Sequence, residues 1–406
     1  MSRLSRLHSA RRSGSVTPRL GFAVVLAGVM FGAHPLDAQQ SASDRTRQPA
    51  SDRAQQPTSD YYVYVAAESD DEVAVVRYGP AGIAVVESIP VGLFPTEIDG
   101  AHGIAVTPDG SRWAVSIAHG LPYGQIQVYE VGTNRRVGAV DAGLFPATMQ
   151  ATKGDLLFVA NFNLHGDRVP STISVIDLGS LVEIAQITTC AMPHGSRLNA
   201  SATRHYSACM MDEQVVEIDA RTLQVSRRLF VRPGHEQALS VDVTDAVGSA
   251  GPSSDGTRCG PTWVQVSPDG ASLYVACNKN REVLEVDLDQ WTVARRFPTG
   301  AGPYNLEVSP DGRLMVVTFK SDQATGIFDL QSGEMRATVE NTRRLPHGVV
   351  ISPDSRYAFV SVEGVGGEPG TVDVIDLDTG ARVASVGLGK QAGGIGFWKQ
   401  EPAGSI

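Results

Sequence analysis

Short alternating runs of hydrophobic and polar residues fill the chain from residue 61 onward. Four related runs, each with a Ser/Thr-Pro-Asp turn near its start, begin at Val106, Val266, Val308 and Ile351, and the last three lie 42 and 43 residues apart. Segments that end in an acidic residue, such as ISVIDL and VDVIDL, recur with them. Alternation with period two and frequent turn residues predicts short antiparallel strands, so we expect an all-β protein.

A repeat of about 43 residues that contains four strands is typical of one blade of a β-propeller. The complete repeats begin near His102, Pro146, His194, Thr262, Tyr304 and His347. Residues 61–91 supply three further strands without an innermost one, and residues 393–399 supply the missing strand. We therefore predict a seven-bladed propeller over residues 61–400, closed where its two ends pair, with an insertion at about 233–260.

The blade motif has the form G-x-x-P-x-G-[IV]-x-[VI]-S-P-D-G-x-x-x-Y-V-[AT]-N, followed by V-x-V-I-D-x-x-T. With this motif the chain resembles the YVTN-repeat (YncE-like) propellers over nearly all of residues 61–400. Similar blades occur in nitrous-oxide reductase, in haem-d1 nitrite reductases and in bacterial lactonases. The resemblance therefore implies a fold and does not imply one activity, because propellers carry many unrelated functions.

The two ends of the chain differ from the repeats. Arginines precede the apolar run 20–33, which is shorter than the ~20 residues of a membrane span, and a cleavage site follows at Ala38. Residues 1–38 therefore predict a signal peptide, residues 39–60 a disordered linker without large apolar residues, and residues 401–406 a tail. We expect an exported protein, periplasmic or extracellular, with no membrane span once the signal is cleaved.

Composition and charge narrow the range of functions. Hydrophobic residues make up 42% of the 406 residues and charged residues 19%, which is enough apolar material for a large core. The formal net charge is −10, and the chain becomes more acidic without its basic signal peptide. This charge argues against binding to the phosphate backbone of nucleic acids. The motifs of P-loop, GxSxG and HExxH enzymes and of covalent haem attachment are absent, and we expect a monomer.

The longer and less regular connections of the predicted blades all lie on one face, which we call the working face. His102, His194 and His347 each begin an innermost strand on this face and are each followed by Gly, so we expect them to point toward the central channel. They come from the first, third and sixth complete repeats, which spreads them around the ring. The other candidates on this face are His119, Asn161, His165, His235, Lys320 and Glu363.

Four cysteines occupy matching positions in successive repeats. Export into an oxidising compartment favours disulfides, and the predicted strand order brings Cys190 next to Cys209 and Cys259 next to Cys277 within one blade each. The alternative is copper, because the segments CAMPH (190–194) and CMM (209–211) combine thiol, thioether and imidazole groups. In that alternative Cys190, Met192 and Cys209 join His102, His194 and His347 as metal ligands.

Three functions are compatible with these features. We favour a binding or interaction module whose working face takes up a small molecule, a metal or another exported protein, and we assign no catalytic residue. The first alternative is a metal-binding protein or an oxidoreductase that depends on copper or another transition metal. The second is a hydrolase similar to the lactonases, in which Glu363 matches their acidic residue but His347 stands where they have Arg.

Overall fold

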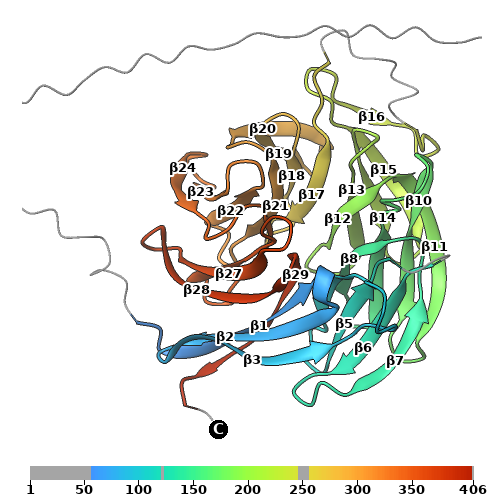
Figure 1. The fold of residues 1–406 in the computed structure, drawn as a ribbon. Coiled ribbons are helices and arrows are strands. Elements are labelled where there is room, and N and C mark those ends of the chain that lie inside the picture. The colour runs from blue at the N-terminus through green and yellow to red at the C-terminus, as the bar shows by residue number, and fades with distance from the viewer. Residues whose placement is uncertain (1–55, 120–122, 246–255, 405–406) are drawn as a thin grey trace, which may run out of the picture. The chain divides into compact units, whose positions relative to one another are not determined.

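The computed structural model describes residues 56–119, 123–245 and 256–404. The predicted signal peptide lies outside these residues, as does most of the predicted linker. The strands form seven antiparallel sheets arranged as the blades of a propeller around a central channel (Figure 1). Numbered from the sheet that holds the first strand, blades 1 to 7 run in chain order, and the expected seven-bladed fold is confirmed. Within the described ranges, no helix is long and apolar enough to cross a bilayer.

Each blade contains an inner, a second, a third and an outer strand. From blade 1 to blade 7 the inner strands are β29 (Ala392–Pro402), β4 (Ala101–Val106), β8 (Pro146–Ala151), β12 (Pro193–Leu198), β17 (Pro261–Val266), β21 (Pro303–Val308) and β25 (Pro346–Ile351). The second strands are β1 (Ser59–Ala67), β5 (Arg112–Ile117), β9 (Leu156–Asn161), β13 (Arg204–Cys209), β18 (Ser272–Cys277), β22 (Leu314–Phe319) and β26 (Tyr357–Val362).

The third strands are β2 (Glu72–Gly79), β6 (Gln125–Glu130), β10 (Pro170–Asp177), β14 (Gln214–Asp219), β19 (Glu282–Asp287), β23 (Ala324–Asp329) and β27 (Pro369–Asp376). The outer strands are β3 (Gly82–Pro90), β7 (Arg136–Asp141), β11 (Val182–Ala191), β15 (Gln224–Phe230), β20 (Thr292–Pro298), β24 (Met335–Glu340) and β28 (Ala381–Lys390). A short strand, β16 (Gln237–Leu239), adds a fifth strand to blade 4 within the predicted insertion. A 3-10 turn, η2 (Glu68–Asp70), joins β1 to β2.

Blade 1 combines the two ends of the folded chain. Strand β29 pairs with β1 in antiparallel register, with Tyr61 opposite Gln400 and Val65 opposite Ile395. Figure 1 shows the red strand β29 beside the blue strand β1. The ring is thereby closed through main-chain hydrogen bonds, and this pairing confirms the predicted closure by the C-terminal strand.

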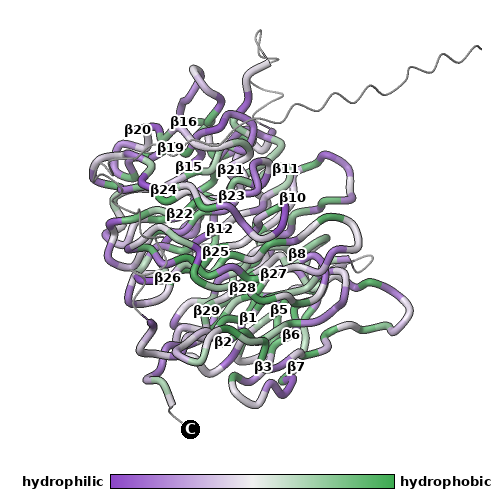
Figure 2. Tube along the Cα trace, turned by 60° about the vertical axis from the view of Figure 1, so that its left-hand side comes forward, coloured by the Kyte–Doolittle hydropathy of each residue, from purple (hydrophilic) through white to green (hydrophobic). Residues whose placement is uncertain are grey.

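The hydrophobic core is divided among the seven contacts between neighbouring blades. One cluster of buried side chains lies in each contact, for example Tyr64 and Trp113 between blades 1 and 2, and Tyr61 and Phe359 between blades 7 and 1. Hydrophobic stretches accordingly follow the strands, whereas hydrophilic stretches are frequent in the connecting loops (Figure 2). Every blade is therefore held by both of its neighbours, which gives the inner strands a rigid frame.

His205 in β13 faces this core and not the channel. Its ring stacks on Phe158 with centroids 5.0 Å apart, and neither ring nitrogen has a hydrogen-bond partner among the described residues. Burial, with a smaller contribution from Arg197, lowers the pKa of His205 to about 3 from its ordinary 6.5. Between these two pH values His205 binds more protons in the unfolded chain than in the folded chain. Its effect on the free energy of unfolding is therefore absent above pH 6.5, and the free energy of unfolding decreases as the pH falls below that value.

We therefore expect His205→Phe to reduce the sensitivity of the protein to acid. The variant keeps the stacked ring but removes the titrating group. Its free energy of unfolding should exceed that of the wild type by a margin that grows by up to about 1.4 kcal/mol for each pH unit below 6.5. Urea unfolding of both proteins at neutral and at acidic pH measures this margin. A margin that is the same at every pH would contradict the expectation.

Candidate metal centre at the channel mouth

The inner strands place one side chain each around the mouth of the channel on the working face. In blades 2 to 7 the pairing of the inner strand with the second strand shifts register near the first residues of the inner strand. Such bulges turn a side chain away from the regular alternation of a strand. The second residue of each inner strand lies in this irregular part, and these residues are His102, Ala147, His194, Thr262, Tyr304 and His347.

Glycine after the histidines allows the inner strands to approach one another. A Cβ atom on Gly103 would lie 1.8 Å from the carbonyl oxygen of Ala147, and one on Gly394 would lie 2.0 Å from that of His102. Real side chains do not fit at such distances, so only glycine is tolerated at these two positions. The histidines therefore line the channel mouth. The glycines allow the inner strands to approach closely, which narrows it.

The three predicted histidines converge. One ring nitrogen each from His102, His194 and His347 lies within 4.8 Å of the others, and all three side chains are buried. The ring centroid of His102 is 6.4 Å from that of His194 and 5.6 Å from that of His347. The distribution of the histidines over blades 2, 4 and 7 lets them meet on the channel axis, as the sequence predicts. Nitrogen atoms this close need only small movements to reach the ~2.0–2.1 Å bonds of one metal ion.

Two of these histidines are oriented by hydrogen bonds at Nδ1. His102 Nδ1 lies 2.7 Å from Glu68 Oε2, and His194 Nδ1 lies 3.0 Å from the carbonyl oxygen of Thr262. Each acceptor holds the proton on Nδ1, so Nε2 is the nitrogen that carries the lone pair. Nε2 of His102 has no hydrogen-bond partner among the described residues. A buried, unpaired imidazole nitrogen is costly in a folded protein unless a ligand occupies it.

The local electrostatics keep the imidazoles of His194 and His347 neutral. Burial lowers the pKa of His194 to about 3 and also lowers the pKa of His347, with Lys320 adding to the effect at His347. Burial alone would raise the pKa of Glu68, but its bonds with His102 and His119 outweigh burial and hold it well below the usual range. Neutral imidazole is the form that binds metals, and an ionised Glu68 is the form that accepts the N–H of His102.

Tyr304, Lys320 and Glu363 complete the wall of the centre between blades 6 and 7. The hydroxyl of Tyr304 donates to Nε2 of His194 over 3.2 Å. Lys320 Nζ lies 4.2 Å from the centroid of the Tyr304 ring and 2.8 Å from Glu363 Oε1, and the same oxygen is 3.6 Å from His347 Nε2. The predicted candidates Lys320 and Glu363 therefore adjoin the histidines and are bonded to each other.

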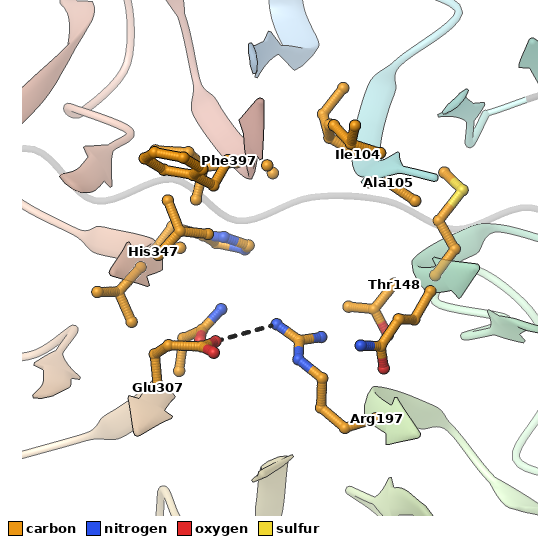
Figure 3. A pocket seen from close by; sticks show the side chains of 18 of the residues that line it. Ile104, Ala105, Thr148, Arg197, Glu307, His347 and Phe397 are labelled. Atoms are coloured by element: carbon orange, nitrogen blue, oxygen red, sulfur yellow. Dashed lines mark ion pairs between the residues drawn. The ribbon is translucent and has the colours of Figure 1, made fainter. Parts of the chain in front are cut away.

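The channel continues beyond the histidines as a cavity of about 210 Å³. His102 and His347 line the end of this cavity that is nearest the working face, and an ion pair of 3.6 Å joins Arg197 to Glu307 across the cavity. Figure 3 shows His347, Arg197 and Glu307 pointing into this cavity from different inner strands, with the ion pair dashed. The cluster of histidines thus lies between the working face and the rest of the channel, which has both polar and apolar walls.

His119 and His165 lie on the solvent side of the three converging histidines. His119 Nε2 donates to Glu68 Oε1 over 3.0 Å, and the His119 and His165 rings are 5.7 Å apart. Phe145 packs against both rings and against His102, and partly buried Met192 packs on the cluster that contains Phe145. Met192 therefore packs beside the residues that surround the three histidines.

The cysteines are paired as expected, but one pair is placed differently. The structure contains the disulfides Cys190–Cys209, with Cα atoms 5.9 Å apart, and Cys259–Cys277, with Cα atoms 4.4 Å apart. Cys190 belongs to the outer strand β11 of blade 3, which continues to Ala191, so its bridge to Cys209 joins two blades and is not confined to one. Because both sulfurs are bonded, Cys190 and Cys209 cannot serve as thiolate ligands, which removes them from the copper site considered above.

The remaining candidates have structural or solvent positions. Asn161 is buried, its amide donates to Thr172 and Ser174, and its oxygen accepts from the backbone of Gly143. His235 is exposed in the insertion, where only its backbone N–H is seen to bond, to the carbonyl of Arg232. The side chain of Asn161 is therefore engaged in structural hydrogen bonds, and His235 is not among the histidines that converge in the described structure.

The sequence analysis missed two residues of the centre. Tyr304 occupies the same repeat position as His102, His194 and His347, so an alignment of the repeats by their inner strands identifies it. Glu68 has no such signal, because it lies in the η2 turn and reaches His102 in the next blade only through the fold.

No family model matches this chain, and no curated protein is significantly similar to it. The resemblance to YVTN repeats therefore depends on the blade motifs, and the function has to be argued from the centre itself.

Proposed function

We propose that this protein is a metal-binding β-propeller that holds one transition-metal ion at the mouth of its channel through His102, His194 and His347. The observation that carries the proposal is the convergence of three buried imidazoles from three different blades to within 4.8 Å. Chance pairs of histidines are common on protein surfaces, but three that meet in the interior leave desolvated lone pairs close together. A bound cation would accept all three lone pairs at once, and at His194 it would take the place of the hydrogen bond from Tyr304.

The surroundings of the ligands support this proposal. Glu68 and the carbonyl of Thr262 fix the orientation of two imidazoles in the way that carboxylates and carbonyls commonly support metal-binding histidines. Imidazole ligands suit Cu²⁺, Zn²⁺, Fe²⁺ and Ni²⁺, whereas Mg²⁺ and Ca²⁺ prefer oxygen. With the cysteines in disulfides, the donor set near the ion contains nitrogen and oxygen, which favours Cu²⁺ over Cu⁺.

Three protein ligands leave at least one coordination position for water or another molecule, as in catalytic zinc sites. The propeller would therefore bind a metal ion and, at the open coordination position of that ion, a second small molecule. Two disulfides fit an oxidising compartment outside the cytoplasm. We accordingly propose that residues 1–38 are a signal peptide for export and that residues 39–60 are a linker. We also propose that the propeller over residues 61–400 is a monomer.

Equilibrium dialysis tests the proposal. Protein freed of metal with a chelator is dialysed against Cu²⁺ and, separately, against Zn²⁺, and bound metal is measured by mass spectrometry. We expect one tightly bound ion per chain for at least one of the two metals. Binding of less than one tenth of an equivalent, or binding that is unchanged when the three histidines are replaced together, would exclude this function.

Glu68→Gln provides a more specific prediction. The variant keeps a hydrogen-bond acceptor for His102 but loses the negative charge that pairs with two imidazoles. Loss of such a supporting carboxylate lowers metal affinity by about 10–100-fold in known sites, and we expect that range here. Competition titrations against a chromophoric chelator measure the change. Glu97→Gln, an exposed residue on the same face, is the matched control and should leave the affinity unchanged.

A further inference from the structure

Tyr304 places a hydroxyl oxygen against the Nε2 atom of His194, one of the three converging histidines. It occupies the same position of the inner strand as the histidines, and its ring lies between those of His194 and His347, with centroids 5.4 Å and 4.8 Å away. Its hydroxyl oxygen is 3.2 Å from Nε2 of His194. That nitrogen is the atom through which His194 would bind the metal, since Nδ1 is held by Thr262.

The distance between the hydroxyl oxygen and Nε2 is that of two ligands of one ion. Ligand atoms bonded at ~2.0–2.1 Å lie roughly 2.8–3.0 Å from each other at octahedral angles and roughly 3.3–3.4 Å at tetrahedral angles. The 3.2 Å separation of Tyr304 and His194 lies between these two ranges. An ion bonded to both atoms would therefore replace the hydrogen bond that joins them.

We propose that the hydroxyl oxygen of Tyr304 is a fourth protein ligand and that the centre selects an oxidised ion, Cu²⁺, over Cu⁺. The proposal rests on the proposed function, because it presupposes the site formed by three histidines. When the ion binds, the O–H bond of Tyr304 breaks, the proton leaves to solvent and the oxygen electron pair forms the bond to copper. No electron is transferred in this step, and no oxidant is required.

Lys320 and Glu363 hold the phenol in place. Lys320 Nζ lies over the Tyr304 ring at 4.2 Å from its centroid and is tethered by its 2.8 Å bond to Glu363. A cation against the ring face restricts the ring, and the ion pair restricts the cation. Tyr304 thus offers an oxygen atom that can bind a metal, and Lys320 and Glu363 hold its ring in position.

Visible absorption and resonance Raman spectroscopy test this proposal with Cu²⁺ as the probe. We expect the wild-type protein with one equivalent of Cu²⁺ to show a phenolate-to-copper charge-transfer band, whose excitation enhances tyrosine ring vibrations. Tyr304→Phe should lose the band, retain one bound Cu²⁺ and bind it about 10–100-fold more weakly. Tyr129→Phe, which removes a buried hydroxyl bonded to Gln127 in blade 2, is the control and should keep the band.

The outcomes separate this proposal from the function on which it rests. Copper bound through the histidines without a charge-transfer band, or with a band that survives Tyr304→Phe, overturns the role of Tyr304 alone. Absence of copper binding in the wild type overturns the proposed function instead. The Raman measurement uses the unaltered protein, so it decides the question even if Tyr304→Phe does not fold.

Discussion

His194→Ala is expected to lower the affinity for Cu²⁺ by at least about 100-fold, more than the loss of a supporting residue. His194 is fully buried, and its Nε2 is hydrogen-bonded to the hydroxyl of Tyr304. Removal of His194 leaves two imidazoles, from blades 2 and 7, and takes away the only histidine that approaches from the far side of the ring among those that converge in the described structure. Isothermal titration calorimetry with Cu²⁺ measures the change.

The control for this prediction is His235→Ala, which removes an exposed histidine from the insertion. It should leave copper affinity and stoichiometry unchanged. Because His194→Ala also opens a space in the channel wall, circular dichroism should confirm that the variant remains folded, and His347→Gln should show the same loss of affinity with less change in volume. Equal affinities of the wild type and both channel variants would contradict the assignment.

Replacement of Cys190 and Cys209 by serine is expected to lower the free energy of unfolding by about 3 kcal/mol. The disulfide closes a loop with a sequence separation of 19 residues, and in the chain-entropy model a loop of this size accounts for that magnitude. The bond also joins blade 3 to blade 4, so its loss should loosen the contact between these two blades. Urea unfolding under non-reducing conditions measures the effect.

The second disulfide supplies the comparison. Cys259 and Cys277 close a loop with a separation of 18 residues, so serine at both positions should cost a similar free energy. Hydrogen exchange distinguishes the two variants, because we expect faster exchange in β11 only when the bridge between blades is missing. Peptide mapping without reduction should recover the linked pairs 190–209 and 259–277 from the wild type. Recovery of free thiols at these positions would contradict the pairing.

The fold was predictable because each blade repeats the same local signals. Turns such as Ser267-Pro268-Asp269 and strands of alternating hydrophobicity recur at a nearly constant spacing, and each repeat has too little core to fold alone. The closing strand could be inferred because residues 61–91 lack an inner strand. Cys190 was assigned to the wrong blade because β11 continues to Ala191 without a glycine or proline to mark its end.

The candidate centre was only partly predictable. Repeat positions identify the three histidines, but their convergence depends on the bulges of the inner strands and on the close approach of those strands at Gly103. The position of Glu68 beside His102 depends on the contact between blades 1 and 2, for which the sequence contains no local signal. A side chain from another blade becomes a neighbour only once the ring has closed.

A crystal structure of the protein soaked or grown with Cu²⁺, with data collected at the copper absorption edge, tests the central claim most directly. The account predicts one strong anomalous peak at the channel mouth, within about 2.0–2.3 Å of a nitrogen of His102, of His194 and of His347. A peak only at His119, His165 or His235, or a channel mouth without a peak at full copper loading, would contradict it.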